Sequence, residues 1–540
     1  MKKNLLTLFA FLIPFINFAK QSTADKIDSI FKDYTGWFVE AIFYEIPFTE
    51  TFQIPWVVIV LIGGATYFTI YFKLINITGF LTAIKVVRGK YEDIEKHGAD
   101  TLYGDVTPNE QEDIIETIRD DDADGEVSHF QALTAALSAT VGLGNIAGVA
   151  VALSIGGPGA TFWMIIAGIL GMASKFAECT LGVKYRDIGP DGTVYGGPMY
   201  YLKKGLLQKG MGGFGKVLAV LFAIFVIGGS FGGGNMFQAN QAAAQFVKLF
   251  ELEGTNGAMW FGAVIAVIVA IVIIGGIKRI AKVTEKIVPF MAGIYVLGAL
   301  IILGANYMHI GEAFSLIFEG AFSGLGIAGG LVGVMIQGIR RGAFSNEAGV
   351  GSAAIAHSAV RTKYPASEGI VALLEPFIDT VVICTMTALV IIITNFDNNI
   401  IDYGVEIKEG VELTATAFDS VIPHFSVVLT FAVIMFAFST MISWSYYGMQ
   451  GWVYLFGRGK VTELIYKLLF CIFIWVGSAI SLGSVIDFSD AMIFAMVVPN
   501  IIGVVLLTPV VRKELNRYMK AIRIKKEALD DGLEDLQKHM

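Results

Sequence analysis

About eleven apolar segments, each long enough to cross a lipid bilayer, constrain the fold of this 540-residue chain more than any other feature. A transmembrane helix needs about 20 mostly apolar residues, because the hydrocarbon core of a bilayer is about 30 Å thick. Segments of this kind lie at about 54–75, 130–155, 160–184, 215–245, 259–277, 285–305, 325–340, 368–394, 424–447, 462–482 and 487–510. Hydrophobic residues make up 55 % of the chain and charged residues only 16 %, against roughly 25 % in soluble domains. The sequence therefore predicts an all-α polytopic membrane protein.

Lysine and arginine residues gather in every second loop between these segments. The loops at 306–324 and 395–420 contain only Lys408, whereas loops on the other side carry clusters such as the three basic residues at 85–90. Cytoplasmic loops are enriched in lysine and arginine. The pattern predicts an N-terminus outside and a C-terminus inside. The net charge of −8 does not point to a nucleic-acid partner.

The spans also divide into two sets. If 54–75 is a leading helix, the others form two groups of five, at 129–305 and 325–511, followed by a cytoplasmic tail at 512–540. The first group starts inside and the second outside, so the two groups have inverted topology. Inverted repeats of this kind are a common architecture of secondary transporters.

Each group of five opens with an apolar segment that glycines and polar residues interrupt. The first is 140–148, T-V-G-L-G-N-I-A-G, and the second is 329–356, which carries Gln337, Arg340, Arg341, Asn346 and Glu347 among glycines. Broken backbone at membrane depth survives only where protein buries it or where it lines a watery cavity. Two interrupted segments at corresponding positions point to the binding site of a carrier for a small polar solute.

The first 128 residues hold three segments outside this core. Residues 1–20 have two lysines before an apolar run, which favours a signal peptide over an interfacial helix. Residues 21–53 are expected to be extracytoplasmic. Residues 89–128 are polar and acidic, and they are expected to form a cytoplasmic loop.

The interruption at 140–148 offers ligands from its backbone. Unwound backbone at Gly142 and Gly144 presents carbonyl groups to a sodium ion and amides to a carboxylate. Close packing through small residues explains the glycines about equally well, and the adjacent Asn145 favours the binding interpretation. A phosphate-binding loop is excluded, because these glycines lie inside a membrane span instead of between a strand and a helix.

Two later helices add polar side chains. Most amides at 235–245 are expected to form hydrogen bonds between helices, with one or two of Gln238, Asn240 and Gln241 facing the solute. The segment at 438–446 places hydroxyls at helical spacing beside Trp444. Hydroxyl oxygens suit a hard cation, although hydrogen bonds to their own helix are the alternative.

Three carboxylates lie inside predicted spans: Glu178, Glu375 and Asp379. Ionisable groups at such positions are candidates for function. The alternative is a structural lock, in which the carboxylate pairs with Arg340, Arg341 or exposed backbone donors, and we favour this alternative for Glu375.

Four motifs together resemble the alanine or glycine:cation symporter family of prokaryotes. They are G-L-G-N-I-A-G-V-A at 142–150, Y-G-G-P-M-Y-Y-L at 195–202, G-N-M-F-Q-A-N at 234–240 and R-G-A-F-S-N-E-A-G-V-G-S-A-A-I-A-H at 341–357. The resemblance runs from about 126 to 515. It implies the inverted-repeat fold of the bacterial leucine transporter with one extra leading helix. It also implies a place in the bacterial or archaeal cell membrane, no cofactor, and import of alanine, often also glycine, together with sodium.

The resemblance further implies which residues bind the transported species, with the broken helices at 140–148 and 337–346 around the amino acid. Its neighbours would be Gly142, Gly144, Asn145, Gln238, Gln241, Phe344, Asn346 and Trp444. Sodium would be held by Thr140, Asn145, Ser439, Thr440 and Ser443. Two features depart from the family pattern: the acidic loop is longer, and Gln241 stands where a small hydroxyl residue is expected, which leaves substrate size open.

Other classes of function fit the sequence less well. The nearest alternative is a proton-coupled carrier that uses Glu178, Glu375 or Asp379. A channel would need a selectivity filter, but the only filter-like run, at 193–197, lies in an expected cytoplasmic loop. For an enzyme, no nucleophile–base pair or metal-ligand cluster stands out in the sequence among 6 histidines and 3 cysteines.

Overall fold

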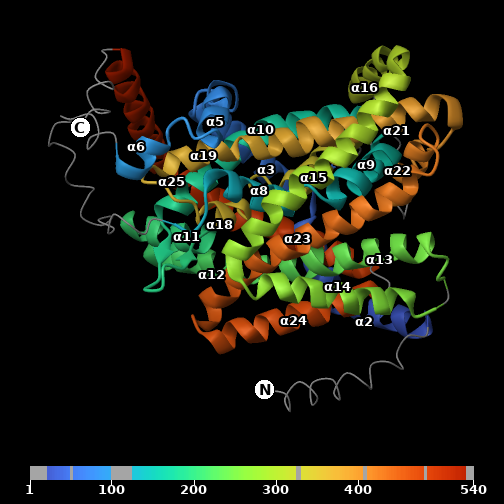
Figure 1. The fold of residues 1–540 in the computed structure, drawn as a ribbon, viewed down its shortest axis with the longest axis horizontal. Helices are drawn as coiled ribbons and strands as arrows, with labels where there is room; N and C mark the ends of the chain where they lie inside the picture. Colours follow the sequence, from blue (N-terminus) through green and yellow to red (C-terminus); the bar gives the residue numbers. More distant parts are fainter. Residues whose placement is uncertain are drawn as a thin grey trace.

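A computed structural model describes residues 21–48, 53–98, 125–253, 255–323, 330–405, 410–479 and 483–530. Residues 1–20 and most of the acidic loop at 89–128 lie outside these ranges, so the expected signal segment does too. Figure 1 shows long helices running along the longest axis of the molecule, with α6, α11 and the C-terminal end of α25 at one end and α21 and α22 at the other.

The first group of five contains the first helix break. Its helices are α8 (His129–Thr140), the π-helical turn η3 (Gly144–Gly148), α9 (Val149–Gly156), α10 (Gly159–Lys184), α12 (Gly212–Phe231), the π-helical turn η4 (Gly232–Met236), α13 (Phe237–Leu249), α14 (Gly257–Ile273) and α15 (Gly276–Ala305). A capping box starts α8: the Ser128 hydroxyl accepts from the Gln131 amide at 3.3 Å, and the Gln131 side chain accepts from the Ser128 amide at 3.1 Å.

The second group of five begins after residue 329. Its helices are α17 (Gly330–Asn346), α18 (Ala353–His357), α19 (Pro365–Ala372), α20 (Leu374–Pro376), the π-helical turn η6 (Phe377–Cys384), α21 (Thr385–Asn398), α23 (Phe425–Phe456), α24 (Lys460–Ala479) and α25 (Gly483–Asp530). The predicted boundary of the tail at 512 is not a helix end, because α25 continues to Asp530.

Shorter elements surround this core. They are α2 (Gln21–Ile42), the strands β1 (Glu45–Pro47) and β2 (Gln53–Pro55), α3 (Trp56–Tyr71), α4 (Ile75–Thr78), α5 (Phe80–Val87), α6 (Glu92–His97), the strands β3 (Asp187–Ile188) and β4 (Val194–Tyr195), α11 (Pro198–Gln208), the 3-10 turn η5 (Tyr307–His309), α16 (Ile310–Ser323) and α22 (Gly410–Asp419). Each strand pair is an antiparallel hairpin. The loops at 306–324 and 395–420 therefore contain helices.

Within the described ranges, 7 helices are long and apolar enough to cross a membrane, or 8 if the bent pair α8 and α9 is one span. The shorter apolar helices α3 and α14 coincide with two further predicted spans. The chain is therefore a multi-pass membrane protein, as its composition predicts.

The first helix break lies where the sequence predicts it, whereas the second lies further along the chain than predicted. Helix α8 ends at Thr140, and the helix that resumes at Gly144 is bent by 53°. The second break does not lie at 337–346, because α17 is helical through Asn346. It lies at 347–352, where Glu347, Gly349 and Gly351 have positive φ angles of 54°, 82° and 93°. Such angles end a helix, and glycine adopts them at little cost.

Contacts with a carboxylate and an aromatic ring explain why α17 can contain two arginines and still be a continuous helix. Arg340 and Arg341 lie 3.4 Å and 3.8 Å from the carboxylate of Asp490 on α25, and the Arg340 guanidinium lies 4.3 Å from the ring centre of Phe43. Paired charges are tolerated inside a membrane protein. The two arginines therefore do not mark the position at which the helix ends.

Candidate functional site at the two helix breaks

A cavity lies where the two helix breaks meet α23, η4 and α25. Its lining consists of small residues, a few polar side chains and two aromatic rings: Ala139, Thr140, Gly142, Leu143, Gly144, Gly233, Gln238, Phe344, Ser345, Glu347, Thr440, Trp444 and Ile493. Residues from both groups of five contribute. A pocket between the halves of an inverted repeat is where secondary transporters hold their solute.

Glu347 and Trp444 form one wall of this cavity. The indole nitrogen of Trp444 donates to Oε1 of Glu347 at 3.1 Å, and the Ser352 hydroxyl donates to the other carboxylate oxygen. Both Glu347 and Trp444 are buried. Gly234 lies behind the indole, since a Cβ atom at this position would come within 2.3 Å of Trp444. The glycine therefore allows η4 to pack directly against the ring.

Gln238 brings an acceptor atom that has no partner. Its side-chain nitrogen donates to the Gly233 carbonyl at 3.0 Å. Its side-chain oxygen is buried and has no hydrogen-bond partner among the residues that the structure describes. A buried polar atom without a partner is costly, so it is typical of a position where a ligand or water supplies the missing hydrogen bond.

Asn145 points into a polar cluster beside the cavity. Its side-chain oxygen accepts from the Gly142 amide at 2.7 Å, and its side-chain nitrogen donates to Oδ1 of Asp379 at 2.7 Å and to the Ser345 hydroxyl at 3.1 Å. The Ser345 hydroxyl in turn donates to Oδ2 of Asp379 at 2.8 Å. These bonds connect the first break to α17 and η6.

The hydroxyl groups of α23 bind the carbonyl groups of α8. Thr440 donates to the Ser138 carbonyl at 3.1 Å, and Ser443 donates to the Ala135 carbonyl at 3.0 Å. In the reverse direction, the Ser138 hydroxyl donates to the Ser439 carbonyl at 2.7 Å, while the Ser439 hydroxyl bonds within α23 at 2.9 Å. Hydrogen bonding to their own helix thus describes Ser439 but not Thr440 or Ser443.

The structure separates the predicted binding residues into two sets. Those in the cavity lining are Thr140, Gly142, Gly144, Gln238, Phe344, Thr440 and Trp444. Those outside the lining are Asn145, Gln241, Asn346, Ser439 and Ser443. Asn346 donates to the Thr380 hydroxyl at 2.9 Å, and Gln241 donates to the Asn240 side chain at 3.4 Å. The prediction that amides of α13 join helices holds for Asn240, which donates to the Gly477 carbonyl at 3.2 Å.

Sequence reasoning missed Glu347 and Ser345 as cavity residues. Both lie in the longest of the four motifs, at 341–357, so the sequence did contain a signal that pointed to them. Because a carboxylate after a charged helix is also expected in an ion pair, the sequence alone did not place Glu347 at the cavity.

Glu375 is paired, but not with the residues that the sequence suggested. Its carboxylate lies 2.9 Å from the Lys175 ammonium and also contacts His357, and all three side chains are buried. The predicted pairing with an arginine of α17 is wrong, because both arginines lie against Asp490. Glu178 accepts from the Asn500 amide at 2.9 Å.

The interrupted helices, the polar cavity between them and the surrounding apolar spans define a secondary transporter of the broken-helix class. The chain belongs to the sodium:alanine symporter family, whose model matches residues 109–531. The family predicted from the four motifs is therefore confirmed.

Individual relatives support the same assignment. The chain is 40 % identical over 401 residues to the sodium/alanine symporter AgcS of Methanococcus maripaludis, covering 74 % of this chain and 86 % of AgcS. It is 32 % identical over 412 residues to the amino-acid carrier protein AlsT of Bacillus subtilis, covering 75 % and 82 %. Among solved structures, MhsT in complex with L-phenylalanine matches with a TM-score of 0.50 at 13 % identity, covering 74 % of this chain and 99 % of MhsT. This match confirms the predicted fold.

Proposed function

We propose that this protein imports alanine, and also glycine, together with sodium by alternating access, with its N-terminus outside and its C-terminus inside a bacterial or archaeal cell membrane. The observation that carries this proposal is the unpartnered side-chain oxygen of Gln238 in a cavity that also contains the Glu347 carboxylate. Two acceptors in the same cavity suit an ammonium group. The relationship to a sodium/alanine symporter supports the choice of substrate.

The cavity suits a zwitterion with a small side chain. The helix that resumes at Gly144 presents backbone amides at its start, and such amides stabilise a carboxylate. On this basis the amino acid lies with its carboxylate toward Gly144 and its ammonium group toward Gln238 and Glu347. Phe344 and Trp444 then bound the space for the side chain, which favours alanine and glycine over larger amino acids.

Sodium is a transported substrate in this proposal. Its site lies at the end of α8, where Thr140 and Thr440 line the cavity and the backbone leaves its helical hydrogen bonding. Oxygen atoms are the preferred ligands of hard cations. Asn145, Ser439 and Ser443 complete the proposed set, and the Ser443 hydroxyl and the Ser439 backbone carbonyl also join α23 to α8. Sodium bound here would order the first break and so raise the affinity for the amino acid.

The test is uptake of labelled alanine into proteoliposomes under an inward sodium gradient, with choline in place of sodium as the control. We expect concentrative uptake only with sodium. Replacement Gln238→Leu should raise the KM for alanine at least about tenfold, because a charged donor loses its acceptor. Gln245→Leu, on the same helix but outside the cavity lining, is the matched control. Equal uptake in choline driven by a proton gradient would contradict the proposal.

A further inference from the structure

The segment that follows the leading helix presents apolar and basic side chains on its outer face. Figure 1 shows α5 at the edge of the molecule. The exposed residues, which we call the α4–α5 stripe, are Leu74, Ile77, Leu81, Lys85 and Arg88. Gly79, between the two helices, also has helical φ and ψ angles. The last four residues of the stripe, spaced three or four apart, therefore lie on one face.

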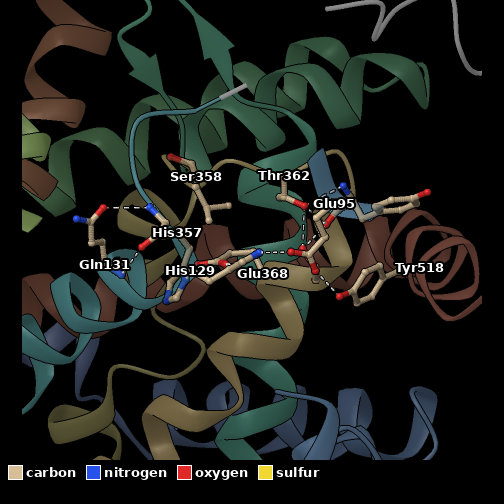
Figure 2. A network of polar contacts seen from close by, with 12 residues as sticks. Glu95, His129, Gln131, His357, Ser358, Thr362, Glu368 and Tyr518 are labelled. Atoms are coloured by element: carbon tan, nitrogen blue, oxygen red, sulfur yellow. Dashed lines mark hydrogen bonds and ion pairs between the residues drawn. The ribbon is translucent and has the colours of Figure 1, made fainter. Parts of the chain in front are cut away.

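The opposite face of the same segment packs into the protein. Its buried residues are Ile75, Asn76, Ala83 and Val86. The Asn76 amide donates to the Ile169 carbonyl of α10 at 3.1 Å. Beyond α5, Figure 2 shows Glu95 of α6 between His129, at 2.7 Å, and Tyr518, which donates to it. Contacts on both sides of α5 thus hold the segment against the core and leave the stripe facing outward.

The stripe changes from apolar to positively charged along its length. Leu74, Ile77 and Leu81 are 50 %, 66 % and 67 % exposed. Residues 73–90 include 4 lysines and arginines and no aspartate or glutamate. The side chains of Lys85 and Arg88 form no ion pair or hydrogen bond with any residue that the structure describes. Their positive charges are therefore not compensated by described parts of the protein.

The carboxylates that follow α5 do not change this balance. Glu92 and Asp93 of α6 pair with Lys96 and Lys525. Each is therefore engaged by a lysine outside the stripe.

An apolar surface that leads into two positive charges suits a lipid better than a soluble anion. From Ile75 to Val87 the two helices extend about 20 Å, too short to cross the hydrocarbon core. Helices of this kind lie in the membrane interface, with apolar residues toward the acyl chains and basic residues at the headgroups. Ile70 of α3, just before the stripe, is 70 % exposed, so the stripe follows a lipid-facing part of the leading helix.

We propose that the α4–α5 stripe binds an anionic phospholipid of the inner leaflet. Its acyl chains lie along Leu74, Ile77 and Leu81, and its phosphate lies at Lys85 and Arg88. The inference rests on the proposed orientation, in which the basic loop at 85–90 is cytoplasmic. A lipid with net negative charge is preferred, because the choline group of a zwitterionic lipid offsets the attraction of its phosphate.

The bound lipid also supports the transport site. The ring centre of Phe80 on α5 lies 4.7 Å from that of Phe377 at the start of η6. Two residues further along η6, Asp379 accepts from the side-chain nitrogen of Asn145 at 2.7 Å. A lipid that holds α5 in place limits the movement of η6 and so stabilises this hydrogen bond at the first helix break. Sodium-driven uptake is therefore expected to be faster in a membrane that contains anionic lipid.

The first test measures lipid binding in detergent and does not depend on transport. The purified protein is mixed with equal amounts of phosphatidylglycerol and phosphatidylcholine, and the retained lipids are identified by mass spectrometry of the intact protein. The wild type should retain phosphatidylglycerol in preference. The double variant Lys85→Gln with Arg88→Gln should weaken this retention about tenfold.

The matched control is the double variant Arg523→Gln with Lys526→Gln. It makes the same change of charge at the same spacing, at exposed positions of α25. Arg523 lies about 20 Å along the helix from the end of the predicted span at residue 510. This control should retain phosphatidylglycerol as the wild type does.

The second test measures sodium-driven alanine uptake in vesicles of phosphatidylcholine, alone or with one part in four of phosphatidylglycerol. Uptake by the wild type and by the α25 control should be at least about threefold faster with phosphatidylglycerol. The α5 double variant should match the wild type in phosphatidylcholine alone and gain little from phosphatidylglycerol. Because all three proteins experience the same surface potential, a difference between them reports the stripe.

Preference for phosphatidylglycerol that survives in the α5 double variant would overturn the proposed site. Full displacement of the lipid by soluble glycerol phosphate, which has the charge without the acyl chains, would also overturn it. If the α5 double variant is equally slow in both kinds of vesicle, the basic residues hold another part of the protein, such as the acidic residues at 99–124, and not a lipid. If the wild type retains phosphatidylglycerol but takes up no alanine in either vesicle, the lipid site stands and the proposed function fails.

Discussion

The side-chain nitrogen of Asn145 donates to the carboxylate of Asp379 at 2.7 Å, across 234 residues of sequence. The oxygen of the same amide accepts from the Gly142 backbone at 2.7 Å. Asp379 therefore fixes the orientation of an amide that closes the first helix break. The geometry of the break depends on a residue of the second group of five.

Asp379→Asn is expected to weaken sodium dependence. An amide at this position can present its nitrogen to Asn145, which turns that side chain away from Gly142 and loosens the backbone that we propose as a sodium ligand. The sodium concentration for half-maximal alanine uptake should rise about tenfold, equivalent to about 1.4 kcal/mol. Asp397→Asn, at the exposed end of α21, should change it less than twofold. Equal effects of both variants would contradict this role.

The hydroxyl groups of α23 can be tested with a matched serine. Ser443→Ala removes the bond to the α8 carbonyl of Ala135, whereas Ser445→Ala removes a bond within α23, to the Ile442 carbonyl at 2.7 Å. One hydrogen bond contributes roughly 0.5–1.5 kcal/mol. Ser443→Ala should therefore raise the half-saturating sodium concentration about fivefold, measured by sodium titration of alanine uptake. The prediction fails if Ser445→Ala has the same effect.

Gly234→Ala should close the cavity. Its Cβ would come within 2.3 Å of Trp444, so the indole must move. Overpacking of this kind costs about 1–3 kcal/mol. Alanine uptake should fall at least about tenfold. Gly293→Ala on α15, where a Cβ meets nothing within 4 Å, should leave uptake unchanged. Normal uptake by Gly234→Ala would show that the position of the indole does not matter.

Asp187 makes stability depend on pH at the hairpin of β3 and β4. Burial opposes its charge, but hydrogen bonds from Lys204 and from Arg458, the latter at 2.7 Å, outweigh burial and lower the pKa of Asp187 below its usual 3.8. A lowered pKa stabilises the folded state above pH 3.8, and this contribution is lost as the pH falls through the lower value.

The variant Asp187→Asn lacks this contribution. At pH 7 its Tm in detergent should lie slightly below that of the wild type, by the equivalent of at most about 1 kcal/mol, because the pair is partly exposed. The difference should shrink below about pH 4. A difference that grows on acidification would contradict the assignment.

The sequence predicted most of the apolar spans and the first break, because both depend on local properties. Long apolar runs need no partner to be recognised, and Gly142 and Gly144 lie within a few residues of the bend. The second break was placed too early. The charge and glycines of α17 fit a helix once Asp490 pairs with its arginines, and only the backbone angles at 347–352 show where the helix ends.

A second set of contacts could not be predicted from the sequence for a different reason. These are the contacts among the buried ionisable residues Glu95, His129, Glu368, His357, Glu375 and Lys175. His129 and Glu368 are 239 residues apart, and Lys175 and Glu375 are 200 apart. Pairing over such distances follows from the packing of α8, α10 and α19. Sequence alone suggested Glu375 as a structural ion pair but named the wrong partners for it.

Helix α25 continues for 48 residues, from Gly483 to Asp530. Near its start, Asp490 contacts the arginines of α17, and near its end, Lys525 donates to the Lys90 carbonyl at 2.9 Å. In the proposed orientation, α25 thus has one contact toward the outer side of the membrane, at Asp490, and one toward the inner side, at Lys525. A tilt or bend of α25, for which Pro499 and Pro509 provide weak points, would change the two ends together. Such mechanical linkage would keep the two sides from opening at once, and so prevent sodium from leaking through a carrier without substrate.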